Sequence, residues 1–193
     1  MTHLRSDMPT VDFFNRYFQT INKKVGQIEL DKLEQIAGLI EKADSMRKKI
    51  ILVGNGGSAA IASHASVDFT KGAGIRATNF NEADLLTCLA NDYGYEHWVE
   101  KALEFYADPN DLVILISSSG RSPNILNGAN QATRMGLVLI TLSGFSAQNP
   151  LCNQGDVNLW VDSVDYNTIE ITHLTWLLAV IDFLIEKKRA PSL

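Results

Sequence analysis

The sequence predicts an α/β fold in which helices cover both faces of a five-stranded parallel sheet. Five apolar runs are candidate strands, and segments with apolar residues at helical spacing lie between them. The runs are nearly continuous in Val, Ile and Leu, which is typical of strands covered on both faces. Strands that alternate with helices in this way indicate a parallel sheet. The predicted strands are residues 49–53, a weak 77–80, 112–117, 137–143 and 157–161.

Helical patterns fill the segments around these strands. Residues 11–22 and 30–46 each carry apolar side chains every three or four positions. We assign these two helices to an N-terminal prelude, residues 1–47, and the α/β core to residues 48–193, all within a single domain. The other predicted helices are residues 58–70, 83–90, 95–106, 123–135 and 168–187.

The last predicted helix, residues 168–187, is apolar almost all round. A helix with so little polar surface must be buried on several sides, and a subunit interface is one way to bury it. We therefore expect a homo-oligomer. A central core helix of a monomer is the alternative.

The bulk composition is that of an ordinary globular protein. The chain has 193 residues, of which 46% are apolar and 20% charged, and its formal net charge is −5. It has no basic run, so we expect no direct nucleic-acid partner. The start lacks the apolar core of a secretory signal, and no apolar run reaches the roughly 18 residues of a membrane span, so we expect a cytoplasmic protein with no membrane partner. Cys88 and Cys152 have apolar neighbours, which predicts buried free thiols.

Two loops of similar composition follow the first and third predicted strands, at residues 54–58 and 117–122. Backbone N–H groups, hydroxyls and a helix N-terminus gather at such strand ends, which suits a phosphate. For the first loop alone, a tight turn capped by Ser58 is the alternative. Neither loop has a lysine or a nucleotide-binding spacing, so we expect a small phosphorylated metabolite and no nucleotide cofactor. The predicted phosphate-binding residues are Asn55, Gly56, Gly57, Ser58, Ser117, Ser118, Ser119 and Ser122.

Two pairs of polar residues stand out on predicted helices. His64 and Asp68 are four residues apart, so their side chains meet on one helix face. Glu170 and His173 interrupt the otherwise apolar last helix. Such pairs can share a divalent metal or act as an acid and a base on a substrate carbon. The alternatives are a hydrogen-bonded surface pair for the first, and a helix-start carboxylate with a rim histidine for the second.

Several short motifs, residues 54–58 followed by His64, 91–95, 116–122 and 140–144, resemble those of the sugar isomerase (SIS) domain, and within it the bacterial phosphoheptose isomerases. This resemblance implies a flavodoxin-like, three-layer fold and a homotetramer with active sites shared between subunits. It implies a sugar-phosphate ligand and the interconversion of sedoheptulose 7-phosphate with a heptose 7-phosphate. It also implies contacts to the sugar phosphate from Asn55, Ser58, Ser117, Ser118, Ser119 and Ser122, with Asp92 near the substrate.

The resemblance further implies a zinc ion held by a His and a Glu after the first loop and by a Gln and a His on the last helix. That Glu and the last-helix His are the acid/base pair of the family. In this chain His64 matches the first ligand, but Asp68 replaces the Glu and Glu170 replaces the Gln. Leu178 stands at the position of the last-helix His, and a leucine neither binds zinc nor carries a proton. His173 matches a neighbouring histidine of the motif.

Two hypotheses follow from these departures. In the first, the site is rebuilt: one zinc ion per subunit is held by His64, Asp68, Glu170 and His173, and the last three carry the proton transfer of an aldose–ketose isomerase. In the second, the chain is a sugar-phosphate-binding or protein-interaction module without turnover, as Leu178 would favour. The isomerase is our main hypothesis.

Overall fold

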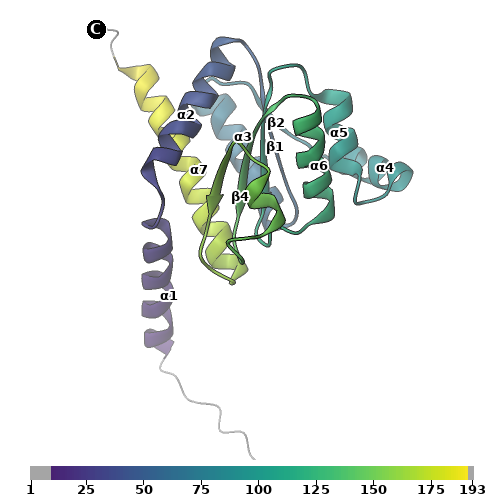
Figure 1. Ribbon diagram of the computed structural model, residues 1–193. Helices are drawn as coiled ribbons and strands as arrows, with labels where there is room; N and C mark the ends of the chain where they lie inside the picture. The colour runs from purple at the N-terminus through teal and green to yellow at the C-terminus, as the bar shows by residue number, and fades with distance from the viewer. Residues whose placement is uncertain (1–9, 191–193) are drawn as a thin grey trace, which may run out of the picture.

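The computed structural model describes residues 10–190, and in this range it forms one five-stranded sheet (Figure 1). The strand order is β2-β1-β3-β4-β5, and all neighbouring strands run parallel. The predicted fold class is confirmed, and each strand agrees with its prediction within one residue at either end. The strands are β1 (Ile50–Gly54), β2 (Ala77–Asn79), β3 (Leu112–Ser117), β4 (Val138–Ser143) and β5 (Val157–Trp160).

The helices agree with the sequence pattern except at some ends. The helix predicted to begin at residue 95 begins at Trp98, because the preceding residues form a turn in which the His97 N–H donates to the Gly94 carbonyl at 3.0 Å. A π-helical turn (Asp68–Gly72) extends α3, and a 3₁₀ turn (Pro150–Asn153) that the pattern did not predict precedes β5. The α-helices of the described chain are α1 (Thr10–Val25), α2 (Leu30–Ser45), α3 (Gly57–Val67), α4 (Ala83–Tyr93), α5 (Trp98–Tyr106), α6 (Pro123–Arg134) and α7 (Tyr166–Arg189).

Helices cover both faces of the sheet and produce two hydrophobic cores (Figure 1). α2, α3 and α7 pack on one face, and α4, α5 and α6 on the other. Successive strand residues point to opposite faces. In β1, Ile50 and Leu52 therefore join the first core, while Ile51 and Val53 join the second. This explains why the strands are continuous apolar runs.

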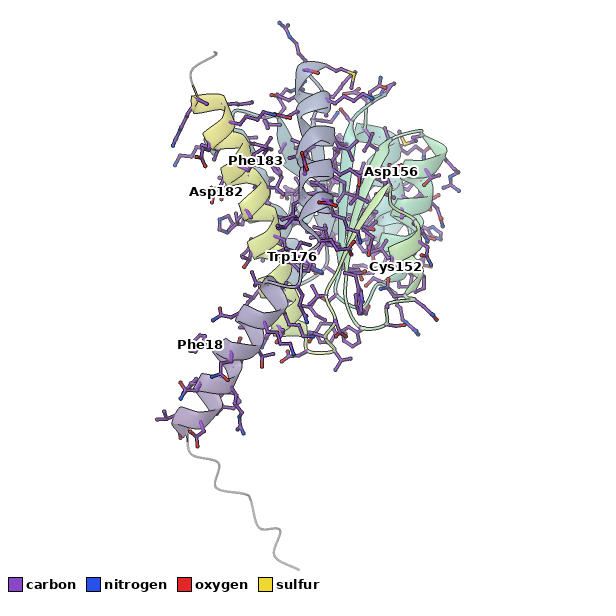
Figure 2. The ribbon with its side chains drawn as sticks, turned by 60° about the vertical axis from the view of Figure 1, so that its left-hand side comes forward. Phe18, Cys152, Asp156, Trp176, Asp182 and Phe183 are labelled. Carbon is purple, nitrogen blue, oxygen red and sulfur yellow. The ribbon has the colours of Figure 1, made fainter. Side chains whose placement is uncertain are left out.

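α1 extends away from the sheet (Figures 1 and 2). None of its residues is buried, and the apolar side chains of Val11, Phe14 and Phe18 are exposed. Its C-terminal end is held by α7, because the Trp176 Nε1–H donates to the Val25 carbonyl at 2.9 Å. The apolar surface of α1 is thus uncovered in a single protomer.

α7 is the central helix of the first core. By length and composition it could cross a membrane, although Glu170 and His173 keep its continuous apolar runs short. Half of its most apolar window is buried, and the helix packs beside α1, α2 and α3. It is therefore a core helix of this fold, with Ile171 and Phe183 left exposed.

Neither cysteine is a buried thiol, so that prediction is wrong. Cys88 is exposed on α4, and Cys152 is part-exposed in the 3₁₀ turn, where its Sγ donates to the Asn149 carbonyl at 2.9 Å. Both are free. Apolar neighbours in the sequence did not bury Cys88, because α4 presents it on the outer side of the helix.

Candidate functional site

The two predicted phosphate loops lie side by side. β1 and β3 are paired in register from Ile50 opposite Leu112 to Gly54 opposite Ile116, so their carboxyl ends meet. The loops line a cavity of about 120 Å³ that stays open to solvent, and the start of α7 adds Tyr166 and Glu170 to its lining. Of the predicted phosphate-binding residues, Asn55, Ser58, Ser117, Ser118, Ser119 and Ser122 line this cavity.

The first loop requires glycine at two positions. Gly56 has a φ of 55° and a ψ of −122°, which L side chains rarely adopt. A Cβ on Gly54 would lie 2.6 Å from the backbone of Ser58, so only glycine lets the loop turn this tightly. α3 then begins without a side-chain cap, so Ser58 is not the cap of the helix. The helix N-terminus is therefore available to an anion.

The second loop brings hydroxyl groups together. The Ser117 and Ser122 hydroxyls lie 3.1 Å apart, and the Ser119 hydroxyl accepts the Arg121 N–H at 3.2 Å. The Ser118 hydroxyl is buried and has no hydrogen-bond partner in the described part of the chain. α6 begins directly after Ser122, again without a side-chain cap. The cavity thus gathers two helix N-termini and several neutral donors, which is the chemistry of a phosphate site.

Two residues that the sequence did not single out join the loops. Asn124, buried in the first turn of α6, exchanges two hydrogen bonds of 2.9 Å with the side-chain amide of Asn55. The Tyr95 hydroxyl donates to the same Asn55 oxygen at 3.1 Å. Both loops are thereby held to each other. Tyr95 lies in the 91–95 motif, but no sequence pattern marked Asn124.

Glu170 is the carboxylate of the cavity. Its side chain packs against Gly57 at the start of α3, where any Cβ would collide with it. Within residues 10–190 it makes no hydrogen bond and no ion pair. Burial raises the pKa of the Glu170 carboxyl above its usual value. An unpaired carboxylate with a raised pKa next to a phosphate site is a candidate acid/base group.

The His64 and Asp68 side chains meet as predicted, with Nε2 and Oδ2 3.1 Å apart. The pair lies at the end of α3 and the start of its π-helical turn, with 51% and 40% of the two side chains exposed. Neither residue lines the cavity. In one protomer, therefore, this pair is separate from the phosphate loops.

The stretch of α7 that lies level with this pair is apolar. α3 and its π-helical turn run alongside α7, with Gly57 against Glu170 at one end and Gly72 against Ile185 at the other. In both contacts the α7 residue follows its partner by the same number of positions in the sequence, so the two helices stay in step. The same spacing places Leu178 level with His64 and Asp68 along the helix axis. Leu178 packs against the first core. A leucine thus occupies the place where the resemblance implies a histidine ligand.

The remaining predicted residues lie outside the cavity. His173 is fully buried, and its Nε2 lies 3.0 Å from the Ser143 carbonyl oxygen. Asp92 lies on α4 and accepts a hydrogen bond from Asn91 at 2.9 Å. In the described chain no three His, Cys, Asp or Glu side chains form a group that could hold a metal. The structure therefore does not bring together the expected zinc set of His64, Asp68, Glu170 and His173.

The fold and the cavity define a phosphate-binding α/β domain. The sequence profile of the SIS domain family matches residues 13–144, and the chain belongs to this family. It is 32% identical over 143 residues to the phosphoheptose isomerase of Fusobacterium nucleatum, covering 71% of this chain and 74% of that one. It is 34% identical over 171 residues to the phosphoheptose isomerase of Aliarcobacter butzleri, covering 83% and 87%.

A solved structure shows the same fold. The phosphoheptose isomerase from Francisella tularensis superposes with a TM-score of 0.85 over 93% of this chain and 100% of that chain, at 23% identity. The resemblance inferred from the motifs is thereby confirmed.

Proposed function

We propose that this chain is a sugar-phosphate isomerase that interconverts an aldose and a ketose, with a C7 sugar phosphate such as sedoheptulose 7-phosphate as its substrate. The relatives named phosphoheptose isomerase support this proposal over a module without turnover. The observation that carries it is the unpaired Glu170 carboxylate in the same cavity as the two phosphate loops. The expected cytoplasmic location stays a prediction.

The loops bind the phosphate through neutral groups. Hydroxyls of the second loop and the N-termini of α3 and α6 supply donors and partial positive charge to a dianion. The buried Ser118 hydroxyl, which has no partner among residues 10–190, gains one when phosphate binds. Binding at the phosphate end fixes the position of the sugar chain in the cavity.

Glu170 carries the proton transfer. Its carboxylate removes a proton from the carbon next to the carbonyl, which leaves an ene-diolate. A hydroxyl proton then passes from one oxygen of the ene-diolate to the other, and the protonated Glu170 returns its proton to the former carbonyl carbon. A pKa raised toward neutral pH suits a group that must both accept and return a proton. A single carboxylate can serve both carbons because they are adjacent.

The four residues expected to hold zinc are not brought together within one protomer, so no step of the proposed mechanism is assigned to a metal. His173 donates to a backbone carbonyl in the core, and Leu178 stands level with the His64 and Asp68 pair. The donor atoms of one protomer thus do not fit the four-ligand zinc site. We derive proton transfer from Glu170 alone.

A homo-oligomer, with a tetramer as the state implied by the resemblance, is part of the proposal. Phe14 and Phe18 leave an apolar face of α1 uncovered. An apolar groove of about 370 Å³ between α2 and α7 is lined by residues that include Leu33, Val180 and Phe183. Uncovered apolar surfaces of this kind mark protein interfaces. Each subunit can cover such surfaces of another.

Light scattering tests the assembly. The double variant Phe14→Glu/Phe18→Glu places charges on the face of α1 and should lower the molar mass in solution. Phe105→Glu is the matched control, since Phe105 is equally exposed but lies on α5. A wild-type protein that runs as a monomer would reject the oligomer.

Turnover of sedoheptulose 7-phosphate tests the function. The wild-type protein should form the aldose. Glu170→Gln should bind inorganic phosphate at least as tightly as the wild type, because a negative charge next to the phosphate site is removed, but should form the aldose about 10²-fold to 10⁴-fold more slowly. Phosphate binding without turnover in the wild type would favour the non-catalytic alternative.

A further inference from the structure

His173 lies outside the cavity but is connected to it. The residue is on α7, one turn after Glu170, and is fully buried. Its Nε2 lies 3.0 Å from the carbonyl oxygen of Ser143, the last residue of β4. The side chain therefore joins the helix that carries Glu170 to the end of a central strand.

The hydrogen bond to Ser143 shows which nitrogen of the His173 imidazole carries a proton. A carbonyl oxygen only accepts, so Nε2 carries the proton and donates. Burial lowers the pKa of His173 to about 4, against the weaker opposite effect of the bond to Ser143. The Nδ1 atom is buried and has no partner among the described residues. His173 is thus a neutral donor in the core, without access to a substrate.

The peptide unit that accepts this bond also holds the second phosphate loop. The Ser143 carbonyl and the Gly144 N–H belong to one peptide unit, and the Gly144 N–H donates to the Ser118 carbonyl at 2.8 Å. Ser118 carries the buried, unpartnered hydroxyl of the cavity. One rigid group thus connects His173 to Ser118.

α7 and this peptide unit are in close contact. A Cβ on Gly144 would lie 2.6 Å from the Ile169 side chain, so only glycine allows the approach. The Ser143 carbonyl also accepts the Val161 N–H at 2.9 Å. Both of its acceptor positions are used, one by the residue that follows β5 and one by α7. The hydrogen bond from His173 therefore joins α7 to the end of β4 at a defined point.

We propose that His173 is a positioning residue, whose neutral Nε2–H fixes the Glu170 carboxylate on α7 relative to Ser118 in the phosphate loop. This inference rests on the proposed function, because it assigns the residue to the geometry of that site. A displacement of about 1 Å between a reacting group and its substrate can cost about 100-fold in rate. A hydrogen bond that fixes the two sides of the cavity relative to each other therefore helps an isomerase to keep its rate.

Two substitutions separate this role from others. His173→Gln keeps an N–H donor, and His173→Leu removes it at similar volume. The measurements are kcat and KM with sedoheptulose 7-phosphate, the Kd for inorganic phosphate by calorimetry, and thermal unfolding. We expect His173→Leu to lower kcat about 10-fold to 100-fold and His173→Gln to stay within about threefold of wild type. If His173→Leu does not fold, His173→Met, which also lacks a donor, takes its place.

Each outcome decides between roles. Equal loss of kcat in both variants would indicate an acid/base role for His173 and overturn the proposed positioning role. A lower melting temperature with wild-type kcat, KM and Kd in His173→Leu would show a merely structural role and overturn it as well. If the wild type neither binds phosphate nor turns over, the proposed function fails and this inference with it. If the wild type turns over its substrate and His173→Leu does so equally well, the positioning role of His173 is rejected, while the proposed function stands.

Discussion

Replacing Gly57 by Ala should displace the Glu170 carboxylate without harming the fold. The new Cβ would lie 2.7 Å from Oε1 and closer still to Oε2, whereas ordinary contacts begin at 3.4 Å. The carboxylate must therefore move by about 1 Å, which is easy for the end of a side chain. A shift of this size costs about 100-fold in rate, or about 2.7 kcal/mol of transition-state stabilisation.

The assay compares kcat for sedoheptulose 7-phosphate with thermal stability. Gly57→Ala should keep the melting temperature close to that of the wild type, because Gly57 has room to be alanine once the movable end of the Glu170 side chain, which supplies the nearest atoms, shifts. Gly38→Ala is the matched control, since Gly38 lies in α2 and a methyl group added there would meet no atom within 4 Å, and it should retain wild-type kcat. A kcat for Gly57→Ala within about threefold of that of Gly38→Ala would refute the claim that the rate depends on the position of the Glu170 carboxylate.

Four further predictions follow from the same geometry. Glu170→Gln should lower kcat by about 10²-fold to 10⁴-fold, and the acid limb of the wild-type pH–rate profile should lie above the usual Glu pKa. The native state of the wild type holds the Glu170 proton more tightly than the unfolded state does, so the wild type loses stability as the pH rises above 4.5. In urea unfolding, Glu170→Gln should therefore become more stable than the wild type above this pH. Asp68→Asn should change kcat far less than Glu170→Gln in the same assay, because Asp68 does not line the cavity. Ser122→Ala should weaken phosphate binding about tenfold or more by calorimetry, as loss of a hydrogen bond to a charged group costs about 1.5–3 kcal/mol. Asp111→Ala should lower the free energy of unfolding by about 2–4 kcal/mol in urea, because the backbone N–H groups of Lys49 and Asp108 lose their buried acceptor, while the Lys49 ammonium stays paired with Asp108.

The fold was predictable because its determinants are local. The continuous apolar strands and the glycine loops directly encode a sheet that is covered on both faces. The weak strand at 77–80 forms only three residues, since β2 lies at the edge of the sheet. The 3₁₀ turn was missed because Asn149 caps it by accepting the Cys152 N–H at 3.1 Å, a short-range bond without a repeating pattern.

The site was predictable only in part. The phosphate loops follow from residue types at strand ends, and the structure places them around one cavity. The polar pairs were harder to interpret, because helical spacing shows which side chains share a face but not which element covers that face. Burial of His173 against Ser143 and the separation of Asp68 from the cavity depend on the packing of α7. The link between Asn55 and Asn124 joins residues far apart in sequence.

The most direct test of the central claim is proton exchange in deuterated water. Sedoheptulose 7-phosphate is incubated with the wild-type protein and with Glu170→Gln, and the C1 and C2 proton signals are followed by NMR. The wild type should incorporate deuterium and form the aldose, whereas Glu170→Gln should do both at least about 100-fold more slowly while it still binds phosphate. Exchange by Glu170→Gln at the wild-type rate, or no exchange by a wild-type protein that binds phosphate, would contradict the assignment of Glu170 as the proton-transfer group of an isomerase.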